Sequence, residues 1–280
     1  MNAQKLSRPL INFLRSCRTV AYVLLGPLDY LVRVINNKSD FPPLYLRRHV
    51  GPLRTFEASG AEFFTYLRLM SGLQPDHRML DVGCGCGLMA LYLKDFLTER
   101  GSYVGVDLDR ASIEWCRKHI RLPKFEFKHI DINSPAYHPE GKHCGDEFDF
   151  PYLSQSFDVI LFKSVFTHMR PGEVENYLCE TARMMKEGGR CLATFFLLND
   201  EQRTMREKGR NVLEFSHGDT NNWRYVYEHS PESASAYEES YILGLLEKCG
   251  LALAGPVHYG SWSGRSEGLS FQDIMILKHV

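Results

Sequence analysis

Short apolar runs of strand length alternate with segments of helical periodicity through the middle of the chain. Over residues 58–72 the apolar positions recur three and four residues apart, which predicts a helix that covers a sheet. Strands and helices then follow in alternation, an order typical of a parallel sheet with right-handed crossovers. Strands are expected at residues 79–82, 103–107, 125–132, 157–162 and 190–197.

The pattern changes after the fifth strand. Residues 199–236 are polar and rich in turn-forming residues, and we interpret them as an insertion on the substrate side. A helix is expected from about Tyr237 to Cys249, followed by two strands near 251–260 and 270–278 that a short link makes antiparallel neighbours. Residues 58–280 therefore predict one α/β domain with a doubly wound sheet and helices on both faces.

The first 57 residues predict a helical arm and an extended linker. Residues 1–40 look helical with a break near Gly26 and Pro27, and Pro42 and Pro43 stop any further helix. The apolar stretch 19–25 follows several basic residues like a signal peptide, but it has no convincing cleavage site and is far shorter than the roughly 20 residues of a membrane span. We expect an amphipathic arm that packs on the domain, and weak peripheral membrane contact is the alternative.

Charge and cysteine usage narrow the class of protein. The 33 Lys and Arg residues balance 34 Asp and Glu residues, so no strong nucleic-acid signal is present. Eight cysteines are scattered, several of them inside apolar runs such as those around Cys191 and Cys249. Reduced, buried thiols are expected in such places, which favours a cytoplasmic protein.

The candidate binding site is the glycine-rich segment 81–87, Asp-Val-Gly-Cys-Gly-Cys-Gly, between the first strand and the next helix. Glycine is needed there because the backbone turns tightly and must approach a ligand closely. The spacing also fits the dinucleotide pattern G-x-G-x-x-A, and Asp107 lies about 20 residues further on, where a ribose-binding acid belongs. The turn alone therefore leaves a nicotinamide-dependent oxidoreductase open.

Acids at three strand ends favour a different ligand. Asp81, Asp107 and Asp131 suit S-adenosylmethionine, which carries a sulfonium and an ammonium group but no phosphate. Asp107 would take the ribose hydroxyls and Asp131 the adenine amine. The antiparallel end of the sheet also favours this cofactor over a dinucleotide.

Five segments together resemble the ordered motifs of class I S-adenosylmethionine-dependent methyltransferases: 81–87, 105–107, 129–131, 157–160 and 186–189. The resemblance covers roughly residues 58–200 and includes bacterial members without an assigned substrate. It implies a Rossmann-like sheet of seven strands with the last antiparallel and S-adenosylmethionine-dependent methyl transfer, but it does not identify the acceptor. We expect a small-molecule acceptor that is methylated at oxygen or nitrogen. The cofactor contacts that it implies are Asp81, Gly83, Cys84, Gly85, Gly87, Asp107, Leu108, Asp131, Ile132, Lys163 and Ser164.

Few side chains need to act chemically in methyl transfer, because the reaction is an in-line displacement that depends on alignment. His168, just beyond the fourth strand, is the candidate general base for a hydroxyl acceptor. The competing interpretation is that His168 caps or orients the following helix. Trp262 and Arg265 lie in a Gly/Ser-rich link and are candidates for substrate binding, although Arg265 could equally be an ordinary residue at a hairpin tip.

Metal and redox chemistry are not expected. His138, His143 and Cys144 are close in sequence, but no second ligand pair at zinc-site spacing accompanies them. Cys84 and Cys86 form a C-x-C rather than a C-x-x-C motif, so we interpret them as small side chains in a tight turn. A protein that binds the cofactor without catalysis remains a further alternative.

Overall fold

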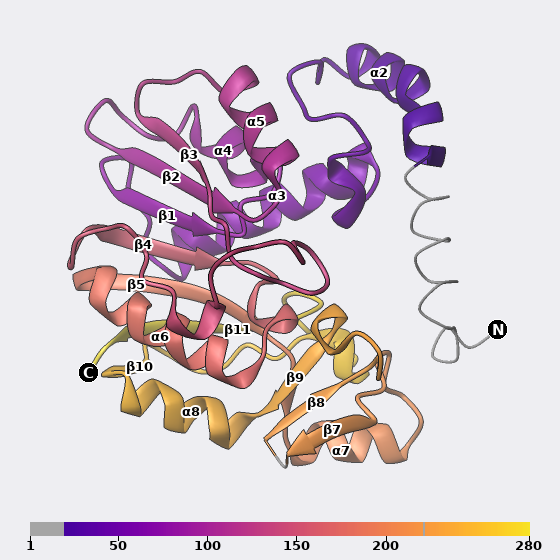
Figure 1. Ribbon diagram of the computed structural model, residues 1–280, viewed down its shortest axis with the longest axis vertical. Helices are drawn as coiled ribbons and strands as arrows, with labels where there is room; N and C mark the ends of the chain where they lie inside the picture. Colours follow the sequence, from indigo (N-terminus) through magenta and orange to yellow (C-terminus); the bar gives the residue numbers. More distant parts are fainter. Residues whose placement is uncertain (1–19, 221) are drawn as a thin grey trace.

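A seven-stranded sheet forms the centre of the protein (Figure 1). The computed structural model describes residues 20–220 and 222–280. The strands lie in the order β10-β11-β5-β4-β1-β2-β3, and β11 runs antiparallel to both of its neighbours. The predicted doubly wound sheet with an antiparallel end is therefore confirmed. The strands are β1 (Arg78–Val82), β2 (Ser102–Asp107), β3 (Phe125–His129), β4 (Phe157–Phe162), β5 (Met185–Phe195), β10 (Leu251–Leu253) and β11 (Asp273–His279).

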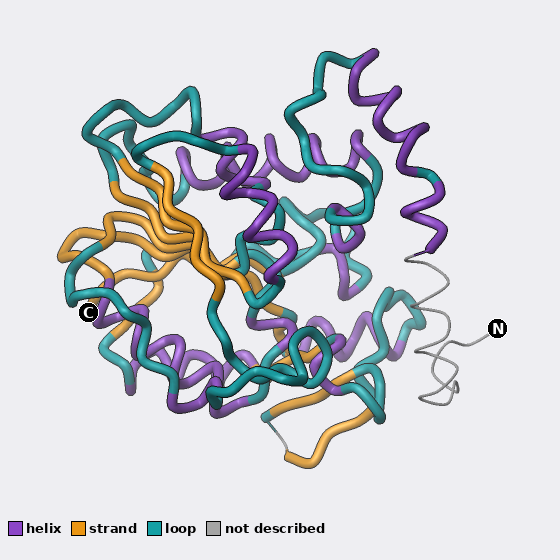
Figure 2. Tube along the Cα trace, turned by 45° about the horizontal axis from the view of Figure 1, so that its top comes forward, coloured by secondary structure: helices purple, strands orange, loops and turns teal. Residues whose placement is uncertain are grey.

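Helices cover both faces of this sheet (Figure 2). On one face α3 (Leu53–Leu69), α4 (Leu88–Leu93) and α5 (Arg110–His119) pack on the strands, and on the other α6 (Pro171–Met184) and α8 (Glu239–Lys248) do so. Successive residues of a strand point to opposite faces, so in β1 Met79 joins the first core and Leu80 and Val82 join the second. The described residues also form five short 3-10 helices: η2 (Arg47–His49), η3 (Gly145–Glu147), η4 (Phe166–His168), η5 (Pro231–Ser233) and η6 (Ser261–Ser263).

The insertion after β5 forms a second, four-stranded sheet. Its strands β6 (Leu197–Leu198), β9 (Ser235–Glu238), β8 (Trp223–Tyr225) and β7 (His217–Thr220) are neighbours in that order, and α7 (Asp200–Glu207) precedes them. Because β9 takes residues 235–238, α8 begins at Glu239 and the helix start predicted near Tyr237 is wrong by two residues.

Trp262 belongs to the core of this insertion. Its side chain is fully buried against Phe196 and Phe215, and its indole Nε1 donates a hydrogen bond to Asp273 Oδ2 at 2.7 Å. The prediction that Trp262 binds substrate is wrong, because a side chain with no exposed surface that fills a core is not available to a ligand.

Helix α2 (Gly26–Ile35) attaches to the domain through charged residues rather than apolar ones. Residues 20–24 are also helical, so the predicted break falls at Leu25, while residues 1–19 lie outside the described part of the chain. Asp29 accepts hydrogen bonds from the Arg33 guanidinium at 3.0 Å and from the Leu44 amide at 3.1 Å, and it pairs with Arg47. The arm thus packs on the domain as predicted, but with its polar face. No helix among the described residues is long and apolar enough to cross a bilayer.

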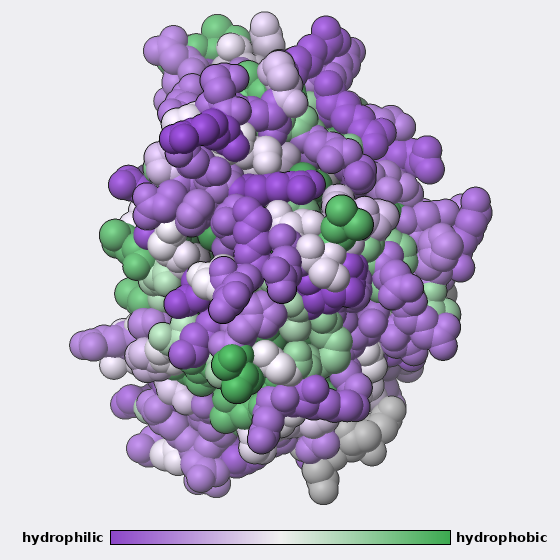
Figure 3. Space-filling view, turned by 90° about the vertical axis from the view of Figure 1, so that its left-hand side faces the viewer, coloured by the Kyte–Doolittle hydropathy of each residue, from purple (hydrophilic) through white to green (hydrophobic). Residues whose placement is uncertain are grey.

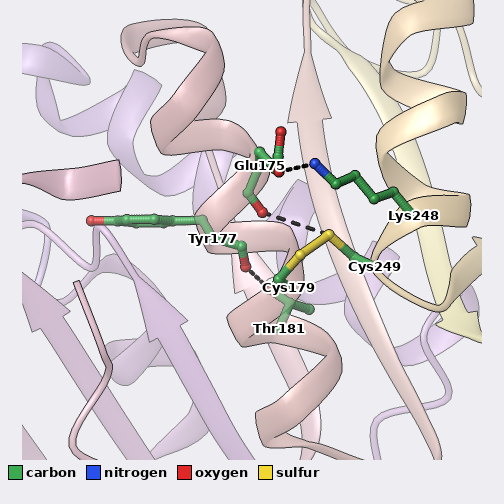
Figure 4. Close-up of a disulfide and its surroundings, with 6 residues drawn as sticks. All are labelled: Glu175, Tyr177, Cys179, Thr181, Lys248 and Cys249. Carbon is green, nitrogen blue, oxygen red and sulfur yellow. Dashed lines mark hydrogen bonds and ion pairs between the residues drawn. A yellow bond between two sulfur atoms is a disulfide. The ribbon is translucent and has the colours of Figure 1, made fainter. Parts of the chain in front are cut away.

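A disulfide joins α6 to the end of α8 (Figure 4). It connects Cys179 to Cys249, and the neighbouring Lys248 pairs with Glu175 across the same contact. The expectation of reduced thiols is therefore wrong for these two residues. The free cysteines among the described residues are Cys84, Cys86, Cys116 and Cys191, all buried, and Cys144, which is exposed.

Candidate active site

A cavity of about 490 Å³ opens above the carboxyl ends of the parallel strands. It lies beside β1 and β4, where the order of the strands reverses, and ligands of open α/β sheets bind at this point. Nearly all of the cofactor contacts implied by the sequence line it, whereas Gly87 and the side chain of Asp131 do not. The lining contacts are Asp81, Gly83, Cys84, Gly85, Asp107, Leu108, Ile132, Lys163 and Ser164.

The glycine turn forms the floor of the cavity. Gly83, Gly85 and Gly87 have φ angles of 75°, 53° and 80°, in the left-handed region that other residues seldom adopt. A Cβ atom at Gly83 would lie 2.6 Å from the side chain of Val165, and one at Gly87 would lie 2.9 Å from that of Ile120. A Cβ at Gly85 would meet no atom within 4 Å, so this position borders open space. Packing therefore requires the two outer glycines, and the middle one leaves room for a ligand.

Asp107 ties the end of β2 to the glycine turn. Its two carboxylate oxygens accept hydrogen bonds from the amides of Gly85, at 2.7 Å, and Asp109, at 2.8 Å. Burial raises the pKa of Asp107, and these amide donors oppose that shift by favouring the charged form. The carboxylate thus holds the turn in shape and still has lone pairs that can accept from a ligand.

Asp81, which is buried, and Lys163, which is half-buried, are groups of opposite charge type that line the cavity. The Tyr103 hydroxyl donates to Asp81 at 2.7 Å. Burial raises the pKa of Asp81 to about 7; the charge of Asp107 raises it further, while Tyr103 and Lys163 lower it. Burial also lowers the pKa of Lys163, whose ammonium lies 4.8 Å from the centre of the Phe63 ring. Asp81 therefore titrates near neutral pH.

Asp131 does not line the cavity. Its carboxylate accepts a hydrogen bond from His138 Nε2 at 2.8 Å, which lowers the pKa of Asp131. The cavity wall after β3 is made instead by Ile130, Ile132 and Asn133. Nothing in the sequence indicates this difference, since Asp131 follows its strand in the same way as Asp81 and Asp107.

Gln272 is a cavity residue that sequence reasoning missed. Its Oε1 accepts hydrogen bonds from the hydroxyls of Ser164, at 2.9 Å, and Thr194, at 2.7 Å. Ser164 itself has a left-handed backbone with φ of 58°, a conformation that costs on the order of 1–3 kcal/mol and recurs at ligand sites. Because Gln272 directly precedes β11, the antiparallel strand brings a residue from the end of the chain to the end of β4.

His168 lines the cavity from η4. Its Nδ1 lies 2.9 Å from the carbonyl oxygen of Glu232 and 3.1 Å from the Tyr137 hydroxyl. A carbonyl can only accept, so Nδ1 carries the proton and Nε2 is the basic nitrogen of the ring. Burial lowers the pKa of His168, which keeps the ring neutral at pH 7. These contacts give His168 the tautomer and charge that a general base requires.

Other lining residues come from loops and helices without a recognisable pattern. Tyr137, Met169, Glu173 and Tyr177 lie in the wall of the cavity, and burial raises the pKa of Glu173. Arg265 does not line the cavity. It bonds Glu201 at 2.8 Å and its guanidinium stacks 4.1 Å from the centre of the Tyr259 ring.

No group of three His, Cys, Asp or Glu residues among those described is placed to hold a metal ion. His138, one of the residues weighed for zinc, is instead the partner of Asp131.

The chain is similar to known methyltransferases in sequence and in fold. A family model described as a methyltransferase domain matches residues 80–193. Phthiotriol/phenolphthiotriol dimycocerosates methyltransferase 1 of Mycobacterium ulcerans is 34% identical over 117 residues, which are 42% of this chain and 36% of that protein. The uncharacterized methyltransferase YodH of Bacillus subtilis is 28% identical over 149 residues, 51% of this chain and 56% of that protein. The match thus spans little more than a third of the first relative.

Two solved structures share the fold. A methyltransferase from Methanosarcina mazei superposes with a TM-score of 0.51 at 20% identity, over 74% of this chain and 94% of that one. One from Aquifex aeolicus gives 0.51 at 16% identity, over 85% and 97%. Together with the ordered motifs and the strand order, the matching family model identifies residues 80–193 as part of a methyltransferase domain of the class I S-adenosylmethionine-dependent type.

Proposed function

We propose that the protein transfers a methyl group from S-adenosylmethionine to an oxygen or nitrogen atom of a small-molecule acceptor. The observation that carries the proposal is that Gly85, with open space beside it, and His168 line one cavity. The Mycobacterium ulcerans relative is named as a methyltransferase of phthiotriol and phenolphthiotriol dimycocerosates. An acceptor hydroxyl in this chain would need a base.

The residues around the glycine turn fit the cofactor. When bound, S-adenosylmethionine supplies an electrophilic methyl group on its sulfonium. The backbone at Gly83 and Gly85 would lie against the methionine part, Asp107 would accept from the ribose hydroxyls, and Asp81 would face the ammonium. Lys163 and Ser164, at the end of β4, would close the pocket beside it.

The adenine is proposed to lie against the wall after β3. Ile130 and Ile132 offer the apolar surface there. For Asp131 to reach an adenine amine, its carboxylate would have to exchange the bond with His138 for one to the ligand.

His168 is proposed to take the proton of the acceptor. Its Nδ1–H donates a hydrogen bond to the Glu232 carbonyl, which orients the ring and leaves Nε2 to receive the proton. The acceptor itself would occupy the side of the cavity walled by Met169 and Tyr177, which excludes water from the reacting atoms.

The test is methyl transfer from labelled S-adenosylmethionine to a panel of hydroxyl and amine acceptors. His168→Ala should lower turnover by about 10²–10⁴-fold, as for loss of a general base, while binding of S-adenosylhomocysteine is unchanged. The control is His119→Ala, since His119 lies exposed at the end of α5. Full turnover in His168→Ala would remove the base, and tight cofactor binding without transfer to any acceptor would favour a non-catalytic protein.

A further inference from the structure

The apolar side of helix α2 faces away from the protein. Leu24, Leu28, Leu31 and Ile35 recur three and four residues apart and form one stripe along the helix and the turn before it. Their exposed fractions are 75%, 59%, 53% and 69%. The geometry points to this stripe as a docking surface for an anionic lipid bilayer.

The opposite side of α2 explains how the helix can lie flat against a membrane. Asp29 and Arg33 are buried toward the domain, and Arg33 also donates to the carbonyl oxygens of Ser39, at 3.1 Å, and Phe41, at 2.7 Å. These bonds attach α2 to the domain through its polar face. Its apolar face is therefore exposed to solvent. An ordinary surface helix is arranged the other way round, with its apolar stripe on the core.

Charge favours a bilayer with anionic lipids. The first 28 residues of the sequence hold four basic residues, Lys5, Arg8, Arg15 and Arg18, and no acidic one. The first acid is Asp29, whose charge is already paired with Arg33 and Arg47. Exposed apolar residues adjoining a segment of purely positive charge are the combination by which helices bind in the plane of anionic membranes.

The side of the protein away from α2 shows no comparable apolar stripe among the described residues (Figure 1 and Figure 3). In Figure 1, α2 lies at the edge of the molecule, on the side away from β10, and the space-filling view of Figure 3 shows the left-hand side of Figure 1. That side is mainly hydrophilic, with small separate hydrophobic patches. Isolated exposed apolar residues are ordinary on a soluble surface, whereas a contiguous stripe marks an interaction site.

Helix α2 contacts the segment that forms one wall of the cavity through an ion pair between Asp29 and Arg47. Arg47, fully buried, pairs with Asp29 of α2 and donates through Nε to the Pro42 carbonyl at 2.7 Å. Its neighbours Leu46 and Arg48 line the cavity. A membrane held by α2 would therefore lie next to the segment that borders the active site.

Vesicle flotation tests the inference without cofactor or acceptor, so its outcome is independent of the proposed methyl transfer. Full-length protein is mixed with vesicles of phosphatidylcholine alone or with an equal amount of phosphatidylglycerol. We expect flotation with the anionic vesicles, weakened by salt, and a loss of binding by about tenfold or more in Leu28→Gln/Leu31→Gln. The matched control is Leu153→Gln, because Leu153 is 82% exposed far from α2 in sequence and should bind as the wild type does.

Three results would overturn the inference. The first is wild-type protein that binds neither kind of vesicle, and the second is a double variant that floats like the wild type. Alternatively, size-exclusion chromatography could show a wild-type dimer that Leu28→Gln/Leu31→Gln converts to a monomer, with no flotation of either. That result would assign the stripe to a second copy of the chain.

Discussion

At the scale of single residues, three acids at or near the carboxyl ends of neighbouring strands have three different environments. Asp81 is buried against a tyrosine hydroxyl, Asp107 binds backbone amides of two loops, and Asp131 turns to a histidine. A position at a strand end places the backbone of each acid at the same edge of the sheet. It does not determine the direction of the side chain, which depends on partners distant in sequence.

The burial of Asp81 leads to a prediction about stability and pH. Its pKa in the folded protein is about 7, above the value near 3.9 of an unfolded aspartate, so the folded state holds a proton that the unfolded state releases. The free energy of unfolding should therefore fall as pH rises from about 4 to about 7. Asp81→Asn removes this group while keeping its shape.

Urea denaturation of both proteins without ligand, at several pH values in this range, provides the measurement. The difference between wild type and Asp81→Asn should change by up to roughly 4 kcal/mol across the range, because one pKa unit corresponds to about 1.4 kcal/mol. Contributions from buried acids that do not interact with Asp81, such as Asp273, cancel in the difference. A difference that stays constant with pH would show that Asp81 titrates normally.

At the scale of elements, β5 shows where local patterns mislead. The glycine pair in residues 186–189 has the pattern of a helix end, but α6 ends at Met184 and β5 begins at Met185. Gly188, with φ of 77°, lies where the register between β4 and β5 shifts, so the glycine pair serves an irregularity within a strand. A Gly-Gly pair after a helical pattern is equally typical of a turn and of an irregularity within a strand. Only the pairing with β4 distinguishes these two structures.

The link between α6 and α8 gives a second prediction. Cys179 and Cys249 are separated by 70 residues, so their disulfide restricts a long loop of the unfolded chain. Cys179→Ser should lower the free energy of unfolding by about 2–4 kcal/mol under non-reducing conditions. The control is Cys144→Ser, which replaces an exposed free cysteine. Equal stability of the two variants, with no effect of a reductant on the wild type, would contradict the prediction.

At the scale of the whole molecule, the sequence predicts the main sheet but not what surrounds it. The strands and helices of the main sheet follow one another at short distances along the chain, so their hydrophobic periodicity can be recognised in the sequence. The second sheet was missed because strands such as β6 and β8 have only two and three residues, too few to show alternation. Trp262 was placed at a binding loop because its neighbours are Gly and Ser, whereas Asp273 and Phe196 bury it.

The cavity could be predicted only on its cofactor side. The segment 81–87 and the end of β2 come from consecutive motifs, and they meet as expected. Tyr137, Tyr177 and Gln272 reach the cavity from a loop, a helix and the start of the last strand. These residues come together only through tertiary packing, so no spacing in the sequence predicts that they line one cavity.

The most direct test of the account is calorimetric titration of the folded protein with S-adenosylhomocysteine, with NADH and NADPH as comparison ligands. We predict one molecule of S-adenosylhomocysteine bound per chain and no binding of the nicotinamides. Gly85→Ala should weaken binding by about tenfold or more, because a methyl group would enter the open space at this position, at a cost in stability of only about 1–2 kcal/mol. A folded wild-type protein that gives no heat with S-adenosylhomocysteine, or that binds a nicotinamide more tightly, would contradict the assignment.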